Sequence, residues 1–214
     1  MQLSVAKPKM GQDATVAGEV IKRILCVVLS ICFVYRSFEA YSVSHDIGIV
    51  LLMLSEIFTV LLIVTARFPK TVSRSLYISA ITVTACFYFL VVELSDGIRV
   101  APLAITLGLQ LVGLALQIFA KCHLGRSFSL LPANRGIVQS GPYGMVRHPI
   151  YLGYFLNHVG FLLTLWSPFN LALYVVLHTL QFLRIFEEEK VLRTDPEYNE
   201  YAETVRYRLI PFVV

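Results

Sequence analysis

Charged residues are scarce in this sequence. Only 15% of the 214 residues are Asp, Glu, Lys or Arg, whereas soluble domains usually carry about 25%. Hydrophobic residues make up 57% of the chain, and the mean hydropathy is +0.70. The shortage of charge excludes an ordinary soluble domain and indicates that lipid surrounds most of the chain. The net charge of +4 is small, and nucleic acid is not expected as a partner.

Cysteine is also rare, with Cys26, Cys32, Cys86 and Cys122 as its four occurrences. None of them forms a C-x-x-C pair, so the sequence predicts neither a zinc site nor a disulfide framework. All four lie in or at the end of apolar stretches, and we expect small buried thiols. The neighbouring pair Cys122-His123 has no further ligands beside it, so no metal site is predicted.

Six apolar stretches dominate the chain, and a spanning helix needs about 20 such residues. The stretches are 24–43, 47–66, 76–94, 101–120 and two shorter ones at about 150–165 and 169–186. The sequence Trp166-Ser167-Pro168 between the last two is typical of the tip of a helical hairpin. We therefore predict an all-α, polytopic integral membrane protein with about five to six transmembrane helices, including a C-terminal hairpin.

Charged residues lie inside the first two of these stretches. Arg36 and Glu39 lie three residues apart on one helical face of the first stretch, so we expect them to pair or to reach the interface. Whether this stretch spans fully is left open. Glu56 is the single charge of the second stretch, which makes it a functional candidate. The alternative is that Glu56 is protonated or paired with a neighbouring helix.

Other polar and small residues within the stretches predict helix packing. We expect His158 and His178 to be neutral, hydrogen-bonded packing residues. Gln110 and Gln117 share a helical face and are expected to bind neighbouring helices. The small-xxx-small spacing at 104–108 predicts a close approach of two helices there.

The basic residues are distributed unevenly along this pattern. Sixteen fall at one end of the predicted helices and two, Arg36 and Arg99, at the other. The sixteen are Lys7, Lys9, Lys22, Arg23, Arg67, Lys70, Arg74, Lys121, Arg126, Arg135, Arg147, Arg184, Lys190, Arg193, Arg206 and Arg208. The positive-inside rule then places both termini and the polar stretch 121–149 in the cytoplasm. The first 18 residues lack the apolar core of a signal peptide and are interpreted as a cytoplasmic tail.

Two polar clusters are candidates for chemistry. The first, 141–153, reads Gly-Pro-Tyr-x-x-x-Arg-His-Pro-x-Tyr-x-Gly and predicts a turn followed by a helix that starts at Pro149. Free N–H groups at such a helix start favour an anion. The second cluster runs from Arg184 to the three glutamates 187–189. Three successive residues spread through about 200° of a helix, so at least one glutamate should face solvent. An ordinary salt bridge between Arg184 and Glu188 is the alternative to a functional role.

The spacing in 141–153 resembles the central motif of the isoprenylcysteine carboxyl methyltransferase family. The resemblance extends upstream to Leu-Gly-Arg-Ser-Phe-Ser at 124–129 and downstream through the hairpin to the arginine–glutamate helix. It continues to Tyr198, Tyr201 and Arg-Leu-Ile-Pro at 208–211, and so covers roughly 105–214. This chain departs from the family pattern at Arg135, where many relatives have histidine, and at 195–196, where Asp-Pro replaces Phe-Gly.

The resemblance implies an S-adenosylmethionine-dependent methyltransferase with a cytoplasmic cofactor pocket. The residues expected to bind the cofactor are Ile137, Val138, Gly141, Tyr143, Arg147, His148 and Tyr151. The residues expected to be catalytic are Arg184, Glu188 and Glu189. Residues 1–100 would form N-terminal transmembrane helices and 101–214 the methyltransferase core.

The resemblance also implies a lipophilic or prenylated acceptor taken from membrane lipid. The carboxylate of an isoprenylcysteine-like substrate is the first expectation, because an ionised acid needs no base. Alternatives are N-methylation of a lipid amine and, less favoured, an NADPH-dependent membrane reductase similar to sterol reductases. The bacterial relatives of the family point to the inner membrane of a bacterium.

Overall fold

The computed structural model describes residues 10–67, 71–72, 77, 81–82, 84–85, 87–95, 97–127, 133–134 and 136–210. Most of the third apolar stretch before Phe87, together with Cys86, Arg135 and the first nine residues, lies outside the described residues. Helix α1 begins at Met10, earlier than the first apolar stretch, so residues 10–18 of the predicted tail are helical.

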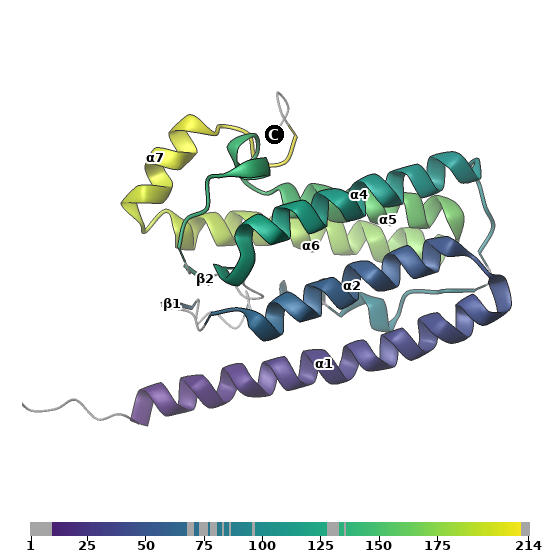
Figure 1. The fold of residues 1–214 in the computed structure, drawn as a ribbon, viewed down its shortest axis with the longest axis horizontal. Helices are drawn as coiled ribbons and strands as arrows, with labels where there is room; N and C mark the ends of the chain where they lie inside the picture. The colour runs from purple at the N-terminus through teal and green to yellow at the C-terminus, as the bar shows by residue number, and fades with distance from the viewer. Residues whose placement is uncertain are drawn as a thin grey trace, which may run out of the picture.

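The described part of the chain is built mainly from helices. These are α1 (Met10–Ser44), α2 (Ile47–Thr65), α4 (Leu103–Leu124), α5 (Pro149–Thr164), α6 (Pro168–Leu192) and α7 (Pro196–Thr204). The long helices lie side by side, with α1 and α5 running opposite to α2, α4 and α6 (Figure 1). Helix α2 packs on α1, α4 and α5, and α4 packs along α5. Short 3-10 turns occur at Tyr88–Leu90 (η1), Gly125–Ser127 (η2) and Gly141–Gly144 (η3). Strands β1 (Thr71–Val72) and β2 (Ala133–Asn134) form one small antiparallel pair, a minor exception to the predicted all-α fold.

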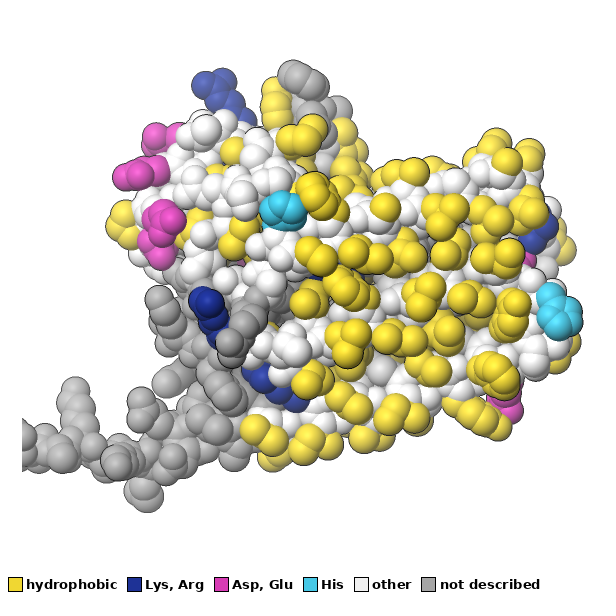
Figure 2. All heavy atoms as spheres, in the orientation of Figure 1, with side chains coloured by type: hydrophobic (Ala, Val, Ile, Leu, Met, Phe, Trp, Pro, Cys, Tyr) yellow, Lys and Arg dark blue, Asp and Glu magenta, His cyan; other side chains and the backbone are white. Residues whose placement is uncertain are grey.

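Four of the described helices are long and apolar enough to cross a membrane. They are Arg23–Ser44 within α1, Ile47–Thr65, Leu103–Leu124 and Pro168–Leu192. Figure 2 shows hydrophobic side chains over the helical body and charged side chains gathered near its two ends. A lipid-facing surface has this composition, because exposed charges are costly within the hydrocarbon layer. The chain is therefore a polytopic integral membrane protein.

The third apolar stretch does not continue as a helix to Leu94, contrary to the prediction. Instead η1 ends at Leu90 and residues 92–94 have no regular structure. The Arg36 guanidinium donates hydrogen bonds to the carbonyl oxygens of Phe89, Leu90 and Val92. Backbone groups outside helices need such partners in an apolar layer. Arg36 therefore has a structural role that its position in the sequence did not suggest.

The hairpin tip predicted at 166–168 is confirmed. The Ser167 side chain caps α6 by accepting a hydrogen bond from the backbone N–H of Asn170. Backbone N–H groups of Ile98 and Trp166 each donate to the carbonyl of the other residue, at 3.1 and 3.0 Å. At the same end of the bundle, Arg99 forms an ion pair of 2.7 Å with Asp46, the N-cap of α2.

The predicted interhelical role of the two glutamines is confirmed. The Gln117 Oε1 atom of α4 accepts a hydrogen bond of 2.7 Å from the Ser55 hydroxyl of α2. The Gln110 amide lies 3.5 Å from the Thr164 hydroxyl at the end of α5. Buried thiols were predicted correctly for Cys26 but not for Cys32 or Cys122, which are exposed on the apolar surfaces of α1 and α4.

The close helix approach lies elsewhere than the spacing at 104–108 suggested. A Cβ atom added at Gly113 of α4 would lie 2.7 Å from the Gly153 carbonyl oxygen of α5. A Cβ atom added at Gly108 would have no atom within 4 Å. The glycines that allow α4 and α5 to pack closely are therefore Gly113, Gly153 and Gly160. A Cβ atom added at any of them would lie less than 3 Å from an atom of the partner helix.

We expect Gly113→Ala to lower the free energy of unfolding in detergent by at least about 1–3 kcal/mol, because backbone rather than a flexible side chain blocks the new methyl group. The matched control is Gly108→Ala, which should be neutral or stabilising by up to about 1 kcal/mol through helix propensity. Thermal unfolding of the two variants checks this expectation. Equal stabilities would show that α4 and α5 are not packed as described.

Candidate active site

Segments far apart in the sequence meet at one end of the bundle. Figure 1 shows α7 and the C-terminal segment beside the loop that precedes α5 and the last turns of α6. The motif 141–153, the end of α6 and residues 198–208 thereby form one cluster of arginine, glutamate, histidine and tyrosine side chains. We refer to this cluster as the terminal site.

The turn before α5 fixes the entry of the motif into the terminal site. Gly141 begins η3 with a φ of +61°, a left-handed conformation that favours glycine. The His123 ring at the end of α4 occupies the space that a Gly141 side chain would need. Pro149 is the first residue of α5, as predicted, and His148 precedes it as the N-cap residue.

The C-terminal segment is attached to this helix start through its backbone. The N–H of Arg147 donates to the Tyr207 carbonyl at 2.9 Å, and the N–H of His148 donates to the Arg208 carbonyl at 2.8 Å. These two bonds satisfy backbone donors beside the start of α5. They also bring the Arg208 side chain to the face of α6 that carries Glu189.

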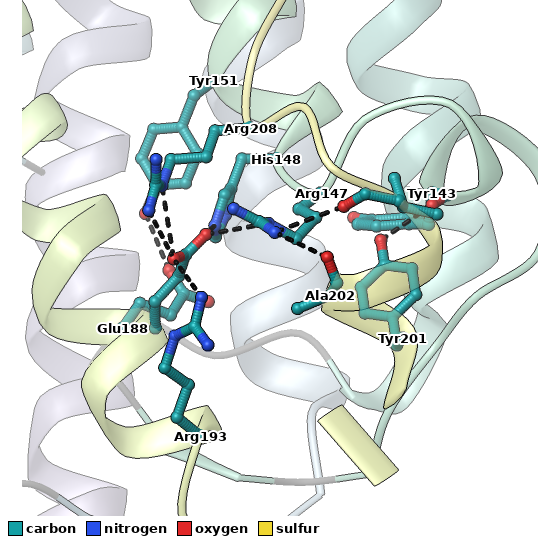
Figure 3. Close-up of polar contacts among 11 residues, drawn as sticks. Tyr143, Arg147, His148, Tyr151, Glu188, Arg193, Tyr201, Ala202 and Arg208 are labelled. Carbon is teal, nitrogen blue, oxygen red and sulfur yellow. Dashed lines mark hydrogen bonds and ion pairs between the residues drawn. The ribbon is translucent and has the colours of Figure 1, made fainter. Parts of the chain in front are cut away.

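Glu189 is the centre of the charged contacts, and Figure 3 labels its partners Arg147, His148, Arg193 and Arg208. Its carboxylate lies 3.0 Å from Arg147 Nε, 3.3 Å from His148 Nε2 and 3.2 Å from Arg208 Nη2. Arg193 reaches the same carboxylate at 3.8 Å. The Glu189 side chain is only 4% exposed. A buried carboxylate is tolerated when several cations compensate for its lost hydration, and this is the arrangement found here.

Arg147 is similarly enclosed. Its side chain is 4% exposed, and its Nη1 atom donates to the carbonyl oxygens of Ala202 and Val205, both at 3.2 Å. Arg147 therefore joins the start of α5 to α6 through Glu189 and to the end of α7 through these carbonyls.

Three tyrosines pack beneath the charged cluster. The Tyr201 hydroxyl donates to the Tyr143 carbonyl at 2.7 Å. Burial raises the pKa of the hydroxyls of Tyr143, Tyr198 and Tyr201, so all three remain neutral at physiological pH. Ile137 and Val138, both expected to bind the cofactor, pack half-buried against this tyrosine cluster.

Tyr151 connects the other two predicted catalytic residues. Its hydroxyl donates to Glu188 Oε2 at 3.0 Å, and the Arg184 guanidinium carbon lies 5.8 Å from its ring centroid. Glu187 points away and pairs with the exposed Lys190. The expectation that one of the three glutamates faces outward is confirmed.

The structure thus brings most of the predicted site residues together. Tyr143, Arg147, His148, Tyr151, Arg184, Glu188 and Glu189 all lie at the terminal site. Sequence reasoning missed the contacts of Arg193 and Arg208 with Glu189. The place of Arg208 in the family-like Arg-Leu-Ile-Pro motif could have indicated that it belongs to the site. No sequence motif pointed to Arg193.

An apolar groove of about 410 Å³ adjoins the terminal site between α5 and α6. Its walls include Tyr151, Phe155, His178, Phe182 and Leu209. Phe155 and Phe182 are exposed on the outer surface of the bundle, so the groove is continuous with the apolar surface that faces lipid. Among the described residues, no group of three or more His, Cys, Asp or Glu side chains is placed to hold a metal ion.

We expect Glu189→Gln to release the C-terminal segment, because Arg147 and Arg208 lose their shared counter-charge in a buried place. Breaking a buried ion pair in this way costs about 3 kcal/mol. Limited proteolysis should then cut within 195–210 faster than in the unaltered protein. Glu187→Gln, which changes an exposed pair on the same helix, is the matched control and should leave cleavage unchanged. Identical cleavage of both variants would contradict the role assigned to Glu189.

Comparison with known proteins bears directly on this site. Residues 106–194 match the sequence model of the isoprenylcysteine carboxyl methyltransferase (ICMT) family. The cobalt-zinc-cadmium resistance protein CzcN of Cupriavidus metallidurans is 32% identical over 112 residues, which are 50% of this chain and 49% of CzcN. This chain therefore matches about half the length of that curated relative.

The matched segment contains nearly all of α4, the whole of α5 and α6, and the motif at 141–153. It includes every residue predicted to bind the cofactor or to act in catalysis. The ICMT resemblance is thus confirmed over residues 106–194, and this match supports a membrane methyltransferase in general.

Proposed function

We propose that the protein is an S-adenosylmethionine-dependent methyltransferase that transfers a methyl group to a lipophilic acceptor. The observation that carries the proposal is the juxtaposition of the terminal site with the apolar groove. Tyr151 contributes to both, since it binds Glu188 and also lines the groove. A polar cofactor and an acceptor with a lipid tail can therefore meet beside one residue.

The donor set of the terminal site fits S-adenosylmethionine. The ligand has an ammonium, a carboxylate, a ribose diol and a sulfonium, and it supplies an electrophilic methyl group when bound. Glu188 suits the ammonium or diol, and Arg184 suits the carboxylate. The buried hydroxyls of Tyr143 and Tyr198 have no hydrogen-bond partner among the described residues. Buried polar groups normally have partners, so these hydroxyls support a polar ligand here.

The groove suits the acceptor's hydrocarbon chain. It opens on the membrane-facing surface, and its walls are mostly apolar side chains of α5 and α6. The ICMT resemblance makes the carboxylate of an isoprenylcysteine-like compound the first acceptor to test. A lipid amine is the second candidate, favoured by the buried acid–base groups described in the next subsection.

Methyl transfer requires positioning and exclusion of water more than acid–base chemistry. In this proposal Arg184 and Glu188 hold the reacting partners. Glu189 is a positioning residue, because its contacts are the cations that attach the C-terminal segment and the start of α5. The distribution of basic residues would place the site at the cytoplasmic face, where a polar cofactor arrives.

The first test is binding of S-adenosylmethionine and of NADPH to the purified protein in detergent, measured by calorimetry. We expect S-adenosylmethionine to bind and NADPH not to bind. Binding of NADPH without binding of S-adenosylmethionine would contradict the proposed methyltransferase and favour a membrane reductase.

The second test concerns Arg184→Ala and Glu188→Gln. Loss of a positioning contact should slow methyl transfer by about a hundredfold. With a carboxylate acceptor, Arg184→Ala should reduce turnover at every pH from 6 to 9, because the ionised acid always needs its counter-charge. The matched control on the same helix is the exposed pair Glu187 and Lys190, whose replacement should leave turnover unchanged. Near-normal rates for Arg184→Ala and Glu188→Gln would show that this face of α6 is structural.

A further inference from the structure

A chain of three polar side chains lies in the middle of the bundle, outside the terminal site. The Tyr88 hydroxyl of η1 is 3.0 Å from Glu56 Oε1 of α2 and 2.8 Å from His158 Nε2 of α5. Glu56 and Tyr88 are each 6% exposed, and His158 is 1% exposed. Side chains of this kind are costly at such depth, which makes them candidates for function.

Counting protons fixes the direction of these hydrogen bonds when Glu56 is ionised. The carboxylate can only accept, so the single Tyr88 proton is donated to Glu56. His158 Nε2 must then carry a proton and donate it to the Tyr88 oxygen. In a neutral imidazole this leaves Nδ1 unprotonated, as a hydrogen-bond acceptor. His158 Nδ1 is buried and has no hydrogen-bond partner among the described residues.

Lys121 of α4 places a basic group near this carboxylate. Its ammonium is fully buried, interacts electrostatically with Glu56, and donates to Thr59 Oγ1 at 2.8 Å and Gln117 Oε1 at 3.0 Å. It also lies 4.7 Å from the ring centroid of Tyr154. A cation held in this way compensates for the lost hydration of a buried carboxylate.

A cavity of about 50 Å³ adjoins the chain, and Glu56, Tyr88 and His158 all contribute to its wall. This volume holds a few water molecules or one small polar group. Gln181 also lines it, and the Gln181 Oε1 atom, like His158 Nδ1, is a buried acceptor without a partner among the described residues. A carboxylate, an imidazole nitrogen and an amide oxygen are groups that recognise N–H donors.

A row of rings on one face of α5 connects this cavity to the terminal site. Ring centroids are 5.8 Å apart for His148 and Tyr151, 6.4 Å for Tyr151 and Tyr154, and 6.0 Å for Tyr154 and His158. Arg184, which stacks on Tyr151, also lines the cavity. The cavity is therefore the inward continuation of the site that would hold the methyl donor.

We propose that His158, Tyr88 and Glu56 form a proton relay that deprotonates the primary ammonium group of a membrane lipid bound in this cavity. The proposal rests on the methyltransferase function proposed above and specifies a lipid amine as its acceptor. A carboxylate acceptor would have no proton to lose and would meet the negative charge of Glu56.

The relay balances as follows. The ammonium gives one proton to His158 Nδ1, the Nε2 proton passes to the Tyr88 oxygen, and the Tyr88 proton passes to Glu56. The amine is then neutral and its lone pair is free to form the bond to the methyl carbon, while the bond between that carbon and the donor sulfur breaks. The product is a methylammonium lipid and a neutral thioether. After the product leaves, the protonated Glu56 passes its proton back through Tyr88 and His158 to water that enters the emptied cavity.

Other titratable and charged groups face the relay from each packed element. They are Cys26 of α1, Lys121 of α4, Tyr154 of α5, and Tyr174, His178 and Arg184 of α6. Lys121 and Arg184 are the two basic groups among them, and the hydrogen-bonded chain itself runs only through His158, Tyr88 and Glu56.

Tyr88→Phe and Glu56→Gln test the relay by kinetics. At pH 7 each should slow methyl transfer to phosphatidylethanolamine vesicles by about a hundredfold, as expected for loss of a general base. Their rates should rise about tenfold per pH unit up to pH 9, because more of the amine is then deprotonated in solution. Binding of S-adenosylmethionine, measured by calorimetry, should stay within about twofold.

The matched controls are Tyr35→Phe and Glu39→Gln, which remove the same groups from a tyrosine–glutamate hydrogen bond on the exposed face of α1. Neither should change the rate or its pH dependence. If Tyr88→Phe and Glu56→Gln leave transfer to every acceptor normal, the relay is wrong and the methyltransferase function stands. If the unaltered protein binds no S-adenosylmethionine, the methyltransferase function itself fails.

A measurement without turnover tests the relay separately. In protein labelled with ¹⁵N-histidine, the signal of His158 is identified by its loss in His158→Gln. We expect the Nε2–H tautomer with an unprotonated Nδ1, and a shift of the Nδ1 signal when dodecylamine is added but not when dodecanoate is added. An Nδ1–H tautomer, or equal responses to the two amphiphiles, would overturn the relay whatever the enzyme assays show.

Discussion

The terminal site depends on one buried carboxylate. Glu189 is 4% exposed, and the guanidinium groups of Arg147 and Arg208 and the imidazole of His148, from two other segments, lie within 3.3 Å of it. Without these partners its burial would be prohibitive, and without Glu189 the buried Arg147 would lack a counter-charge. The start of α5, the end of α6 and the C-terminal segment are therefore held together by mutual compensation of charge. This constraint holds together the segments that carry His148, Tyr151, Arg184 and Glu188.

In the membrane-spanning part, several buried polar groups likewise have partners within the protein, and these groups include backbone carbonyls as well as side chains. Arg36 supplies donors to three carbonyl oxygens where the chain leaves helical geometry. Lys121 and Gln117 supply partners within the bundle, beside Glu56. Polar groups in a dry layer must be satisfied internally. The proposed relay is a natural use of such a network, since its members already exchange hydrogen bonds.

Hydropathy predicted the long helices, because the length of an apolar stretch is a local property. The helix start at Pro149 was likewise readable from its own neighbours. The end of helical structure before Leu94 was not, because the stabilising donor Arg36 lies 53 residues before Phe89, whose carbonyl it binds. Local sequence also could not distinguish Glu188 from Glu189, which are adjacent and chemically identical. Their different roles come from partners that only the folded chain brings together. The glycine contact at Gly113 was missed because the residue it faces lies on another helix.

Hydrogen–deuterium exchange with and without S-adenosylmethionine tests the central claim most directly. If the terminal site holds the methyl donor, adding it should slow exchange in the segments 137–151, 184–189 and 205–208, and leave the opposite end at 93–103 unchanged. Protection confined to one of these segments, or located at 93–103, would show that they do not act as one site. No protection at a concentration that saturates binding would contradict the account.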